Sequence, residues 1–483
     1  MSTLNRRQLL RNAALGGAGL LLAACQPKVV EVERIVEQTV VVTEEVVVKE
    51  AVEVAKEVTR VVEKVVEVEA AERPKVSLLI HTNQGDQWYG WMNEAWERNV
   101  GGWRSENPHI DLVFEPVAGW TADYFPKIFT HVAAGTLGDI VWFPPRHRNH
   151  ISWGIEYDIV TDLMPMVEAT GYDLDQFYPG VIEASSWEGK YYWMPITSEP
   201  SCPVIAYNAD MVDELGIPEP QNDWDYMELT EWGVEATHNS VYGYHVGHMS
   251  PHPIACTPQY RQFGATMVDE TGTQVLPGDS PEAVKRVLQW RHDLIYQHET
   301  MPPPDVEFDV GDMLVAERLV SFTVWPVFIN RLPATIVGDK FRVRFFYAPL
   351  DSRGAPRRNM LNEHVHGVTT FSNNRQEAFE YLTWHSSLEF CVQGLLSGKG
   401  APVGRPDLFA DPRALRVFPG LDLLEPIMAE IEPDFFVGNF RGEEFDREWT
   451  AQTDLVMLDR IGVDEAVEQI VRNCQSVLDM EPA

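Results

Sequence analysis

Val76-Ser-Leu-Leu-Ile-His81 is a short apolar run that leads into a loop at residues 82–85. Two similar runs follow, Ile110-Asp-Leu-Val-Phe-Glu115 and Asp139-Ile-Val-Trp-Phe143, and helical patterns lie between the three. Strands that alternate with helices predict an α/β fold with a parallel sheet covered by helices. Ligands of such sheets bind beyond the carboxyl ends of the strands. The loops after His81 and Phe143 are therefore the first places to look for a site.

The alternation continues through the rest of the chain. Further strands are expected over 189–196 (as two short strands), 204–208, 320–325, 342–347 and 365–371. Helices are expected over 88–100, 124–134, 209–215, 281–298 and 308–318, and residues 413–480 are expected to be mostly helical. The stretch 281–298 begins with Pro281 in its first turn, and its apolar residues recur on one face, as in an amphipathic helix.

Composition and charge exclude some classes of protein. The 483 residues include 73 acidic and 38 basic side chains, which gives a formal net charge of −35. Binding to nucleic acid needs Lys and Arg to neutralise phosphates, so no nucleic-acid partner is expected. A basic face for anionic lipid is equally disfavoured. The hydrophobic fraction of 45% is enough for a sizeable core.

Residues 1–24 are predicted to be an export signal. Arg6 and Arg7 precede a short apolar run and small residues, a run too short to span a bilayer as a mature helix. Residues 5–10 resemble a twin-arginine signal, and Leu22-Ala-Ala-Cys25 resembles the lipobox of bacterial lipoproteins. This resemblance implies a lipid on Cys25 that anchors the protein to the outer face of the cytoplasmic membrane. A plain cleaved signal with an incidental cysteine is the alternative.

Residues 25–73 are predicted to form the anchor and a stalk. From Pro27 to Arg73, Val and Glu dominate, and Val residues recur at alternating steps of three and four. That spacing favours a helical or partly coiled-coil spacer, which would give self-association through the stalk. Runs such as Val40-Val-Val and Val46-Val-Val are strand-like, and a flexible tether remains open as well.

Cysteines and histidines give no firm metal or disulfide signal. Cys202, Cys256, Cys391 and Cys474 are widely spaced, and buried free thiols are expected. His238, His245, His248 and His252 lie within fifteen residues and Cys256 is near, so a metal site is an alternative here. These histidines lie in a stretch that is broken by Gly and Pro. Their spacing is not that of the two histidines in a helical HExxH motif. The prediction is no metal and no cofactor.

The order of segments over about residues 75–475 resembles the extracellular solute-binding proteins of ABC importers, of the maltose- and oligosaccharide-binding type. The most specific piece is Gly189-Lys-Tyr-Tyr-Trp-Met-Pro-Ile196, followed by Ala206-Tyr-Asn-Ala-Asp-Met-Val-Asp-Glu-Leu-Gly-Ile-Pro-Glu-Pro220 and by Trp224 at the start of a helix. The supporting pieces lie at 138–143, 310–316, 367–382, 398–403 and 462–466. The first crossing, with two prolines, and residues 238–262 depart from the family pattern.

The resemblance implies the two-lobed, periplasmic-binding-protein-like fold (type II), which closes on a ligand. Lobe 1 would comprise 74–197 and 366–399, and lobe 2 would comprise 204–362 and 403–483. The chain would cross between lobes at three places, here called the crossover segments: 197–203, 362–366 and 399–403. Prolines and glycines near these segments suit hinges at the ends of elements.

The resemblance also implies a set of ligand-binding residues, chosen by position. These are Asn83, Asp86, Trp88, Trp142, Phe143, Arg146, Glu199, Trp325, His366 and Trp449. Aromatic platforms and polar groups suit the apolar faces and hydroxyls of sugars. Alternatives remain open: Trp142 and Phe143 could pack in the sheet, Glu199 could be a solvated hinge charge, and Trp325 and Trp449 could be core residues.

The expected function is capture of a carbohydrate and its delivery to the permease subunits of an ABC importer. The sequence contains no GxSxG motif, no Walker-type loop and no SxxK with its companions, so an enzyme is not expected. The alternative is an exported glycan-processing enzyme or a metal-dependent binding protein of similar architecture. The identity of the solute does not follow from the sequence.

Overall fold

The computed structural model describes residues 73–83, 102–117, 121–144, 149–304, 306, 310–398, 400–418 and 420–482. The chain divides into two compact units, Met1–Arg73 and Pro74–Ala483. The predicted signal, the lipidated Cys25 and the stalk fall outside the described residues, except for Arg73, and stay predictions. Within the described part of the chain, no helix is both long and apolar enough to cross a membrane.

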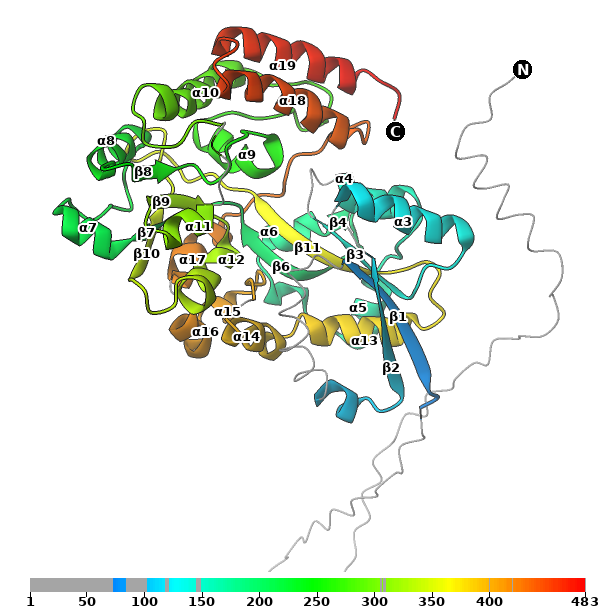
Figure 1. The fold of residues 1–483 in the computed structure, drawn as a ribbon. Coiled ribbons are helices and arrows are strands. Elements are labelled where there is room, and N and C mark those ends of the chain that lie inside the picture. Colours follow the sequence, from blue (N-terminus) through cyan, green and yellow to red (C-terminus); the bar gives the residue numbers. More distant parts are fainter. Residues whose placement is uncertain are drawn as a thin grey trace, which may run out of the picture. The chain divides into compact units, whose positions relative to one another are not determined.

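The first sheet has the strand order β2-β1-β3-β11-β6 (Figure 1). Its strands are β1 (Val76–Asn83), β2 (Ile110–Val117), β3 (Ile140–Phe143), β6 (Met194–Pro200) and β11 (Leu361–Val368). β1 is parallel to β2 and β3, as the three apolar runs predict. β11 is antiparallel to both β3 and β6, so it inserts between two strands that precede it by more than 150 residues.

The second sheet has the strand order β10-β7-β9-β8. Its strands are β7 (Val204–Asn208), β8 (Tyr242–His245), β9 (Leu319–Val324) and β10 (Val343–Tyr347). β7 is antiparallel to β9 and β10, and β8 is parallel to β9. A small two-stranded sheet pairs β4 (Ser186–Trp187) with β5 (Lys190–Tyr191).

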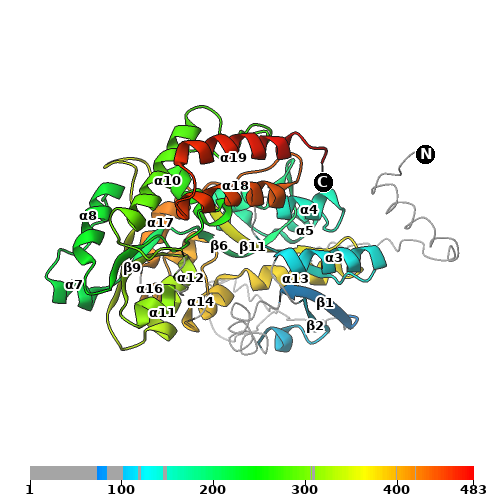
Figure 2. The same ribbon diagram turned by 45° about the horizontal axis from the view of Figure 1, so that its top comes forward.

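Helices connect the strands throughout. Before β6 they are α3 (Thr121–Ala134), α4 (Asn149–Glu156), α5 (Met164–Thr170), the 3-10 helix η1 (Leu174–Gln176) and α6 (Pro179–Ala184). Between β7 and β10 they are α7 (Ala209–Leu215), α8 (Tyr226–Ala236), α9 (Pro253–Gln262), α10 (Ser280–Tyr296), α11 (Val310–Val315), α12 (Pro326–Arg331) and the π-helix η2 (Leu332–Ile336). After β11 they are α13 (Arg375–His385), α14 (Leu388–Leu396), α15 (Pro406–Phe409), α16 (Pro412–Val417), α17 (Leu421–Ala429), α18 (Gly442–Met457) and α19 (Val463–Leu478). Figure 2 shows α18 and α19 side by side.

Helices cover both faces of the first sheet. Leu78 and Ile80 pack in one core cluster with Phe379 of α13. Val141 packs in another cluster with Tyr124 of α3, and Figure 1 shows α3 and α13 on opposite sides of the sheet. Successive strand residues point to opposite faces, so the odd-numbered residues of β1 face α3.

Local sequence explains several element ends. Asp225 caps α8 by accepting from the main chain of Glu228, whose side chain accepts from Asp225 in return. This reciprocal capping box fixes the start of the helix. α10 is the amphipathic helix expected over 281–298, and its residues Val284, Val287, Leu288 and Ile295 are all buried.

Some boundaries differ from expectation. β11 begins at Leu361 and ends at Val368, whereas a strand was expected over 365–371. The polar residues 362–364 hid its first half, which forms because Leu361 to His364 pair with Pro200 to Thr197 of β6. The helix expected over 308–318 is described only as α11, and the one expected over 88–100 lies outside the described residues.

Candidate ligand-binding site

The first crossover segment contacts the other two, by strand pairing with the second and by a main-chain hydrogen bond with the third. The N–H of Ser198 donates to the carbonyl of Pro402 (3.0 Å), and the N–H of Ser201 donates to the carbonyl of Met360 (3.0 Å). The chain then turns from β6 to β7 through Cys202, whose φ of 44° lies in the left-handed region. A non-glycine residue is uncommon there. The turn that joins the two sheets is thus held in place by its neighbours.

The paired ends of β6 and β11 carry a belt of buried polar side chains. The belt consists of Thr197, Ser198, Glu199, Asn362, Glu363, His364 and His366. Burial of polar groups costs free energy unless they are bonded, so such a belt needs either internal partners or a ligand.

Glu199 is the acidic member of this belt with a carboxyl oxygen that has no hydrogen-bond partner among the described residues. Nδ2 of Asn362 donates to its Oε1 at 3.2 Å, and its Oε2 has no hydrogen-bond partner among the described residues. Burial raises the pKa of Glu199 to about 8, against the opposing effects of Asn362 and the charge of Arg331. At neutral pH the carboxyl is therefore largely protonated, and it can both donate and accept.

Glu363, which sequence reasoning missed, is bonded within the protein. Ser185 donates to its Oε2 (3.1 Å) and Ser198 donates to its Oε1 (3.2 Å). These bonds fix Ser198 beside Glu199. Both carboxyl oxygens of Glu363 accept hydrogen bonds within the protein. Glu199 instead has one oxygen, Oε2, that is available to a ligand.

Trp142 and Phe143 are fully buried at the end of β3. Trp142 stacks on His364 with ring centroids 5.7 Å apart, and the main chain pairs it with His366. Phe143 packs against Trp193 at 4.6 Å. The described surroundings of both rings are protein side chains, which agrees with the packing alternative. Their proposed role toward a ligand stays a prediction.

His366 lies on β11 beside Trp142. It is almost fully buried, and neither ring nitrogen has a hydrogen-bond partner among the described residues. Burial, with help from His385 and His364, places the pKa of His366 well below its ordinary value. Its neutral ring retains a donor and an acceptor. Like Glu199, His366 has polar atoms without an internal partner.

Trp325 directly follows β9, and its ring is partly exposed. Its Nε1 donates to Nε2 of His248 at 2.6 Å. Burial, followed by the charge of Arg291, lowers the pKa of His248 to about 4, so the ring is neutral and can accept. The histidine-containing stretch 238–252 therefore contributes one residue that orients Trp325, a role that sequence reasoning did not find.

The other histidines of that stretch make separate contacts. Nδ1 of His238 lies 2.8 Å from the carbonyl of Ala236, and Nδ1 of His245 accepts from the N–H of Gly247 at 3.0 Å. Within the described ranges, the potential metal-binding group of three side chains is His81, Glu115 and His131, which includes none of these four histidines.

Trp449 lies in α18 and is fully buried in the core of the second sheet's helices. Its Nε1 donates to the hydroxyl of Tyr260 at 3.3 Å, and its ring packs near Phe445. These contacts agree with the alternative of helix packing. The side chains of Asn83, Asp86, Trp88 and Arg146 fall outside the described residues; Asn83 is the last residue of β1.

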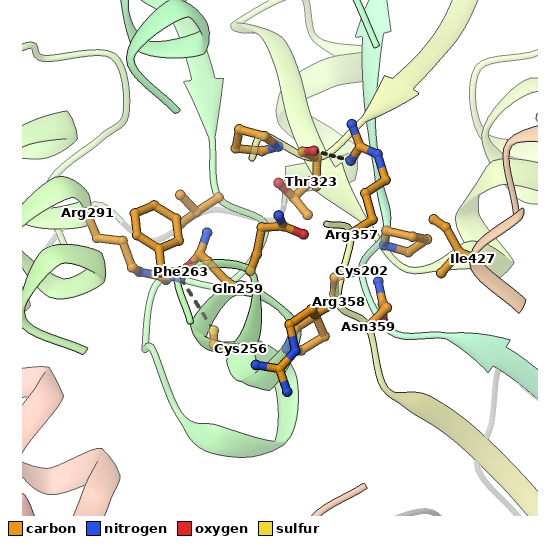
Figure 3. A pocket seen from close by; sticks show the side chains of 16 residues that line it. Cys202, Cys256, Gln259, Phe263, Arg291, Thr323, Arg357, Arg358, Asn359 and Ile427 are labelled. Atoms are coloured by element: carbon orange, nitrogen blue, oxygen red, sulfur yellow. Dashed lines mark hydrogen bonds between the residues drawn. The ribbon is translucent and has the colours of Figure 1, made fainter. Parts of the chain in front are cut away.

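A hollow that is open to solvent lies beside the first crossover segment (Figure 3). Cys202, Thr323 and Arg357 are among its lining residues. Arg291 of α10 also lines it, is fully buried, and donates to Oε1 of Gln259 at 2.7 Å. Figure 3 shows its guanidinium directed at Cys256. The four cysteines described are free, as expected.

The two joined α/β sheets and the polar crossover define a binding protein of the two-lobed, periplasmic-binding-protein-like class. The model of the family "Bacterial extracellular solute-binding protein" matches residues 89–387, and the chain belongs to this family. The resemblance inferred from the sequence is thereby confirmed. A protein of Brucella abortus (strain 2308) named as a binding protein is 30% identical over 384 residues, covering 73% of this chain and 87% of that protein.

Solved structures share the fold. An ABC substrate-binding protein of Listeria monocytogenes in complex with cycloalternan superposes with a TM-score of 0.69 at 15% identity, covering 84% of this chain and 100% of that chain. A maltose-bound protein of T. maritima gives 0.68 at 19%, covering 83% and 99%. A solute-binding protein of Agrobacterium vitis with bound D-mannitol gives 0.63 at 18%, covering 83% and 97%. These matches confirm the predicted fold class.

Proposed function

We propose that the protein is an exported receptor that captures a carbohydrate at the crossover between its two sheets and delivers it to an ABC importer. The observation that carries the proposal is the carboxyl group of Glu199. It is fully buried, one of its oxygens has no partner among the described residues, and its pKa of about 8 keeps it protonated. Such a group matches a sugar hydroxyl, which also donates and accepts.

An aromatic side chain complements this carboxyl group. Trp325 follows Val324, which pairs with Val204 at the start of β7. Glu199 lies on β6, and only residues 201–203 separate β6 from β7. The hydrogen bond to His248 holds the edge of the indole. A held indole offers an apolar face on which the C–H face of a sugar ring can stack.

The ligands named for the structural neighbours support this class of solute. Cycloalternan, maltose and D-mannitol are all polyhydroxylated and uncharged. A protonated acid, an amide and an aromatic ring suit such molecules better than they suit ions. In this proposal the further contacts come from Asn83, Asp86, Trp88, Trp142, Phe143, Arg146 and His366.

Closure of two lobes would trap the ligand. Lobe 1 would comprise 74–197 and 366–399, and lobe 2 would comprise 204–362 and 403–483. Closure is driven only if the ligand binds the closed form better than the open form, through contacts from both lobes. Glu199 near the hinge and Trp325 on the second sheet fit that requirement.

The proposed anchor is the lipid on Cys25, followed by the stalk over 25–73. A tethered receptor stays near the permease subunits to which it passes its ligand. The stalk would also be the place of self-association if it forms a coiled coil. The localisation proposed is the outer face of the cytoplasmic membrane.

The test is a binding screen of mono- and oligosaccharides and polyols, together with mass spectrometry of the solute that co-purifies. A receptor returns its ligand intact and gains thermal stability when the ligand binds. Turnover of an oligosaccharide would refute the proposal in favour of a glycan-processing enzyme. Loss of binding with a chelator would favour a metal-dependent binder instead.

A further inference from the structure

Two histidines and a glutamate converge on the α3 side of the first sheet. His81 of β1 and Glu115 of β2 are direct partners in the parallel register, and His131 lies in the last turn of α3. Nδ1 of His81 and Nε2 of His131 each lie 3.9 Å from an oxygen of Glu115. One potential ligand atom from each of the three side chains lies within 4.8 Å of the other two.

His81 is the buried member of this cluster. Its side chain is fully buried, and neither ring nitrogen makes a hydrogen bond with a described residue. A buried imidazole without a partner costs free energy. A neutral imidazole with a free lone pair is also the form that binds metal ions.

The other two residues are positioned to complete a ligand set. Nδ1 of His131 lies 3.2 Å from Oγ1 of Thr136. If this nitrogen donates the hydrogen bond, the lone pair of Nε2 is directed toward Glu115, and such outer contacts commonly orient ligating histidines. The side chain of Glu115 is 47% exposed and that of His131 is 27% exposed, which leaves a path from solvent to the cluster.

We propose that His81, Glu115 and His131 form a binding site for a divalent transition-metal ion of the zinc class. Two imidazoles and one carboxylate, with a fourth position open to water, are a known zinc ligand set. Mg²⁺ and Ca²⁺ prefer oxygen ligands throughout. Tetrahedral ligands about 2.0–2.1 Å from zinc lie roughly 3.4 Å apart, so the side chains need to move inward by less than about 1 Å.

The site has a structural consequence beyond the proposed capture of a carbohydrate. An ion held by β1, β2 and α3 would tie the helix to the edge of the sheet. His81 is two residues before Asn83, where β1 ends. Metal binding would therefore stabilise the strand that leads into the first predicted ligand loop.

The test uses the purified protein without a histidine tag, titrated with Zn²⁺ by calorimetry, with Co²⁺ as a spectroscopic probe. We expect one equivalent of Zn²⁺ to bind, the melting temperature to rise, and Co²⁺ to give the visible bands of a tetrahedral site. Glu115→Gln and His131→Gln should lose this equivalent. His292→Gln is the matched control, because His292 also pairs with carboxylates but lies on α10; it should keep the site.

Thr136→Val tests the orienting contact separately. Loss of an outer-shell partner commonly weakens metal affinity by about 10–100-fold, and this variant should fall in that range while keeping the stoichiometry. Glu115 and His131 are partly exposed, so their variants are expected to fold. The proposal is overturned if the folded wild-type protein does not bind Zn²⁺. It is also overturned if Glu115→Gln and His131→Gln bind Zn²⁺ as tightly as the wild-type protein does. Neither result bears on carbohydrate capture.

Discussion

Nε1 of Trp325 donates a hydrogen bond to Nε2 of His248, and the two atoms are 2.6 Å apart. The residues follow β9 and β8, neighbouring strands of the second sheet. The guanidinium of Arg291 donates to the main-chain carbonyl of His248 and so fixes the histidine in turn. Trp325, His248 and Arg291, of which two follow neighbouring strands and one lies on α10, therefore determine together how the indole is oriented.

Trp325→Ala is expected to weaken carbohydrate binding by about 1–3 kcal/mol, the usual contribution of an aromatic anchor in a binding site. The physical reason is loss of the ring face on which the sugar would stack. Isothermal titration calorimetry with whichever saccharide binds in the screen measures the effect.

Trp384→Ala is the matched control for this prediction. Trp384 lies in α13, has a similar partial burial and packs against Phe390. We expect this variant to lose stability but to retain affinity. If Trp325→Ala keeps its affinity and only melts earlier, Trp325 is a core residue and the stacking role is wrong.

The strands of the fold could be predicted where an apolar run by itself indicates a buried strand. Val76–His81 and Asp139–Phe143 were expected as strands and correspond to β1 and β3. β11 was harder, because Asn362, Glu363 and His364 are polar residues inside a buried strand. Only pairing with β6 makes that segment extended, and such pairing joins residues more than 150 positions apart.

The site was predictable in part for the same reason. The position of Glu199 in the sequence predicts a ligand contact, but the sequence cannot show that one oxygen of Glu199 lacks a partner among the described residues. The bond from Trp325 to His248 and the buried Arg291 depend on distances between elements remote in sequence. Trp449 is the opposite case. The resemblance to the family predicts that it contacts the ligand, whereas its side chain packs in a hydrophobic core.

Glu199→Gln should change how stability depends on pH. The pKa of Glu199 is raised to about 8 by burial, so between its unfolded value of about 4.3 and 8 the folded state holds a proton that the unfolded state has released. By linkage this costs stability as pH rises, with a slope of at most about 1.4 kcal/mol per pH unit. The variant should therefore gain stability relative to wild type from pH 5 to 8, as measured by chemical unfolding.

The control for this experiment is Glu468→Gln, which changes the same charge at an exposed position on α19. Its difference from wild type should stay small at every pH. A Glu199→Gln difference that does not grow with pH would contradict a protonated carboxyl at the crossover.

Buried histidines should make the protein sensitive to acid. Burial lowers the pKa of His245 to about 3, of His248 to about 4, of His364 to about 4 and of His385 to about 3. Below an unfolded value of about 6.5 the unfolded state takes up protons that the folded state does not, so stability is present above that pH and falls as pH drops toward 4. Melting temperatures from pH 7 to 4 measure this.

His248→Gln tests one contribution to this sensitivity. Glutamine keeps an acceptor for Nε1 of Trp325 but does not titrate. The variant should lose stability less steeply between pH 6.5 and 4, by up to about 1.4 kcal/mol per pH unit. An identical slope in both proteins would show that His248 is not kept neutral by the fold.

Arg291→Met should destabilise the protein and weaken ligand binding together. The fully buried guanidinium donates to Gln259 and to the main-chain carbonyls of His248 and Met249. Without it these partly buried acceptors lose their donor, which costs about 1–3 kcal/mol in the free energy of unfolding. Urea denaturation measures this loss. Arg472→Met, a change at an exposed position on α19, should keep the free energy of unfolding within about 0.5 kcal/mol of wild type.

Since Arg291 also positions His248, which holds Trp325, the saccharide affinity of Arg291→Met should fall as well. Full affinity in a destabilised variant would show that the indole is oriented without this arginine.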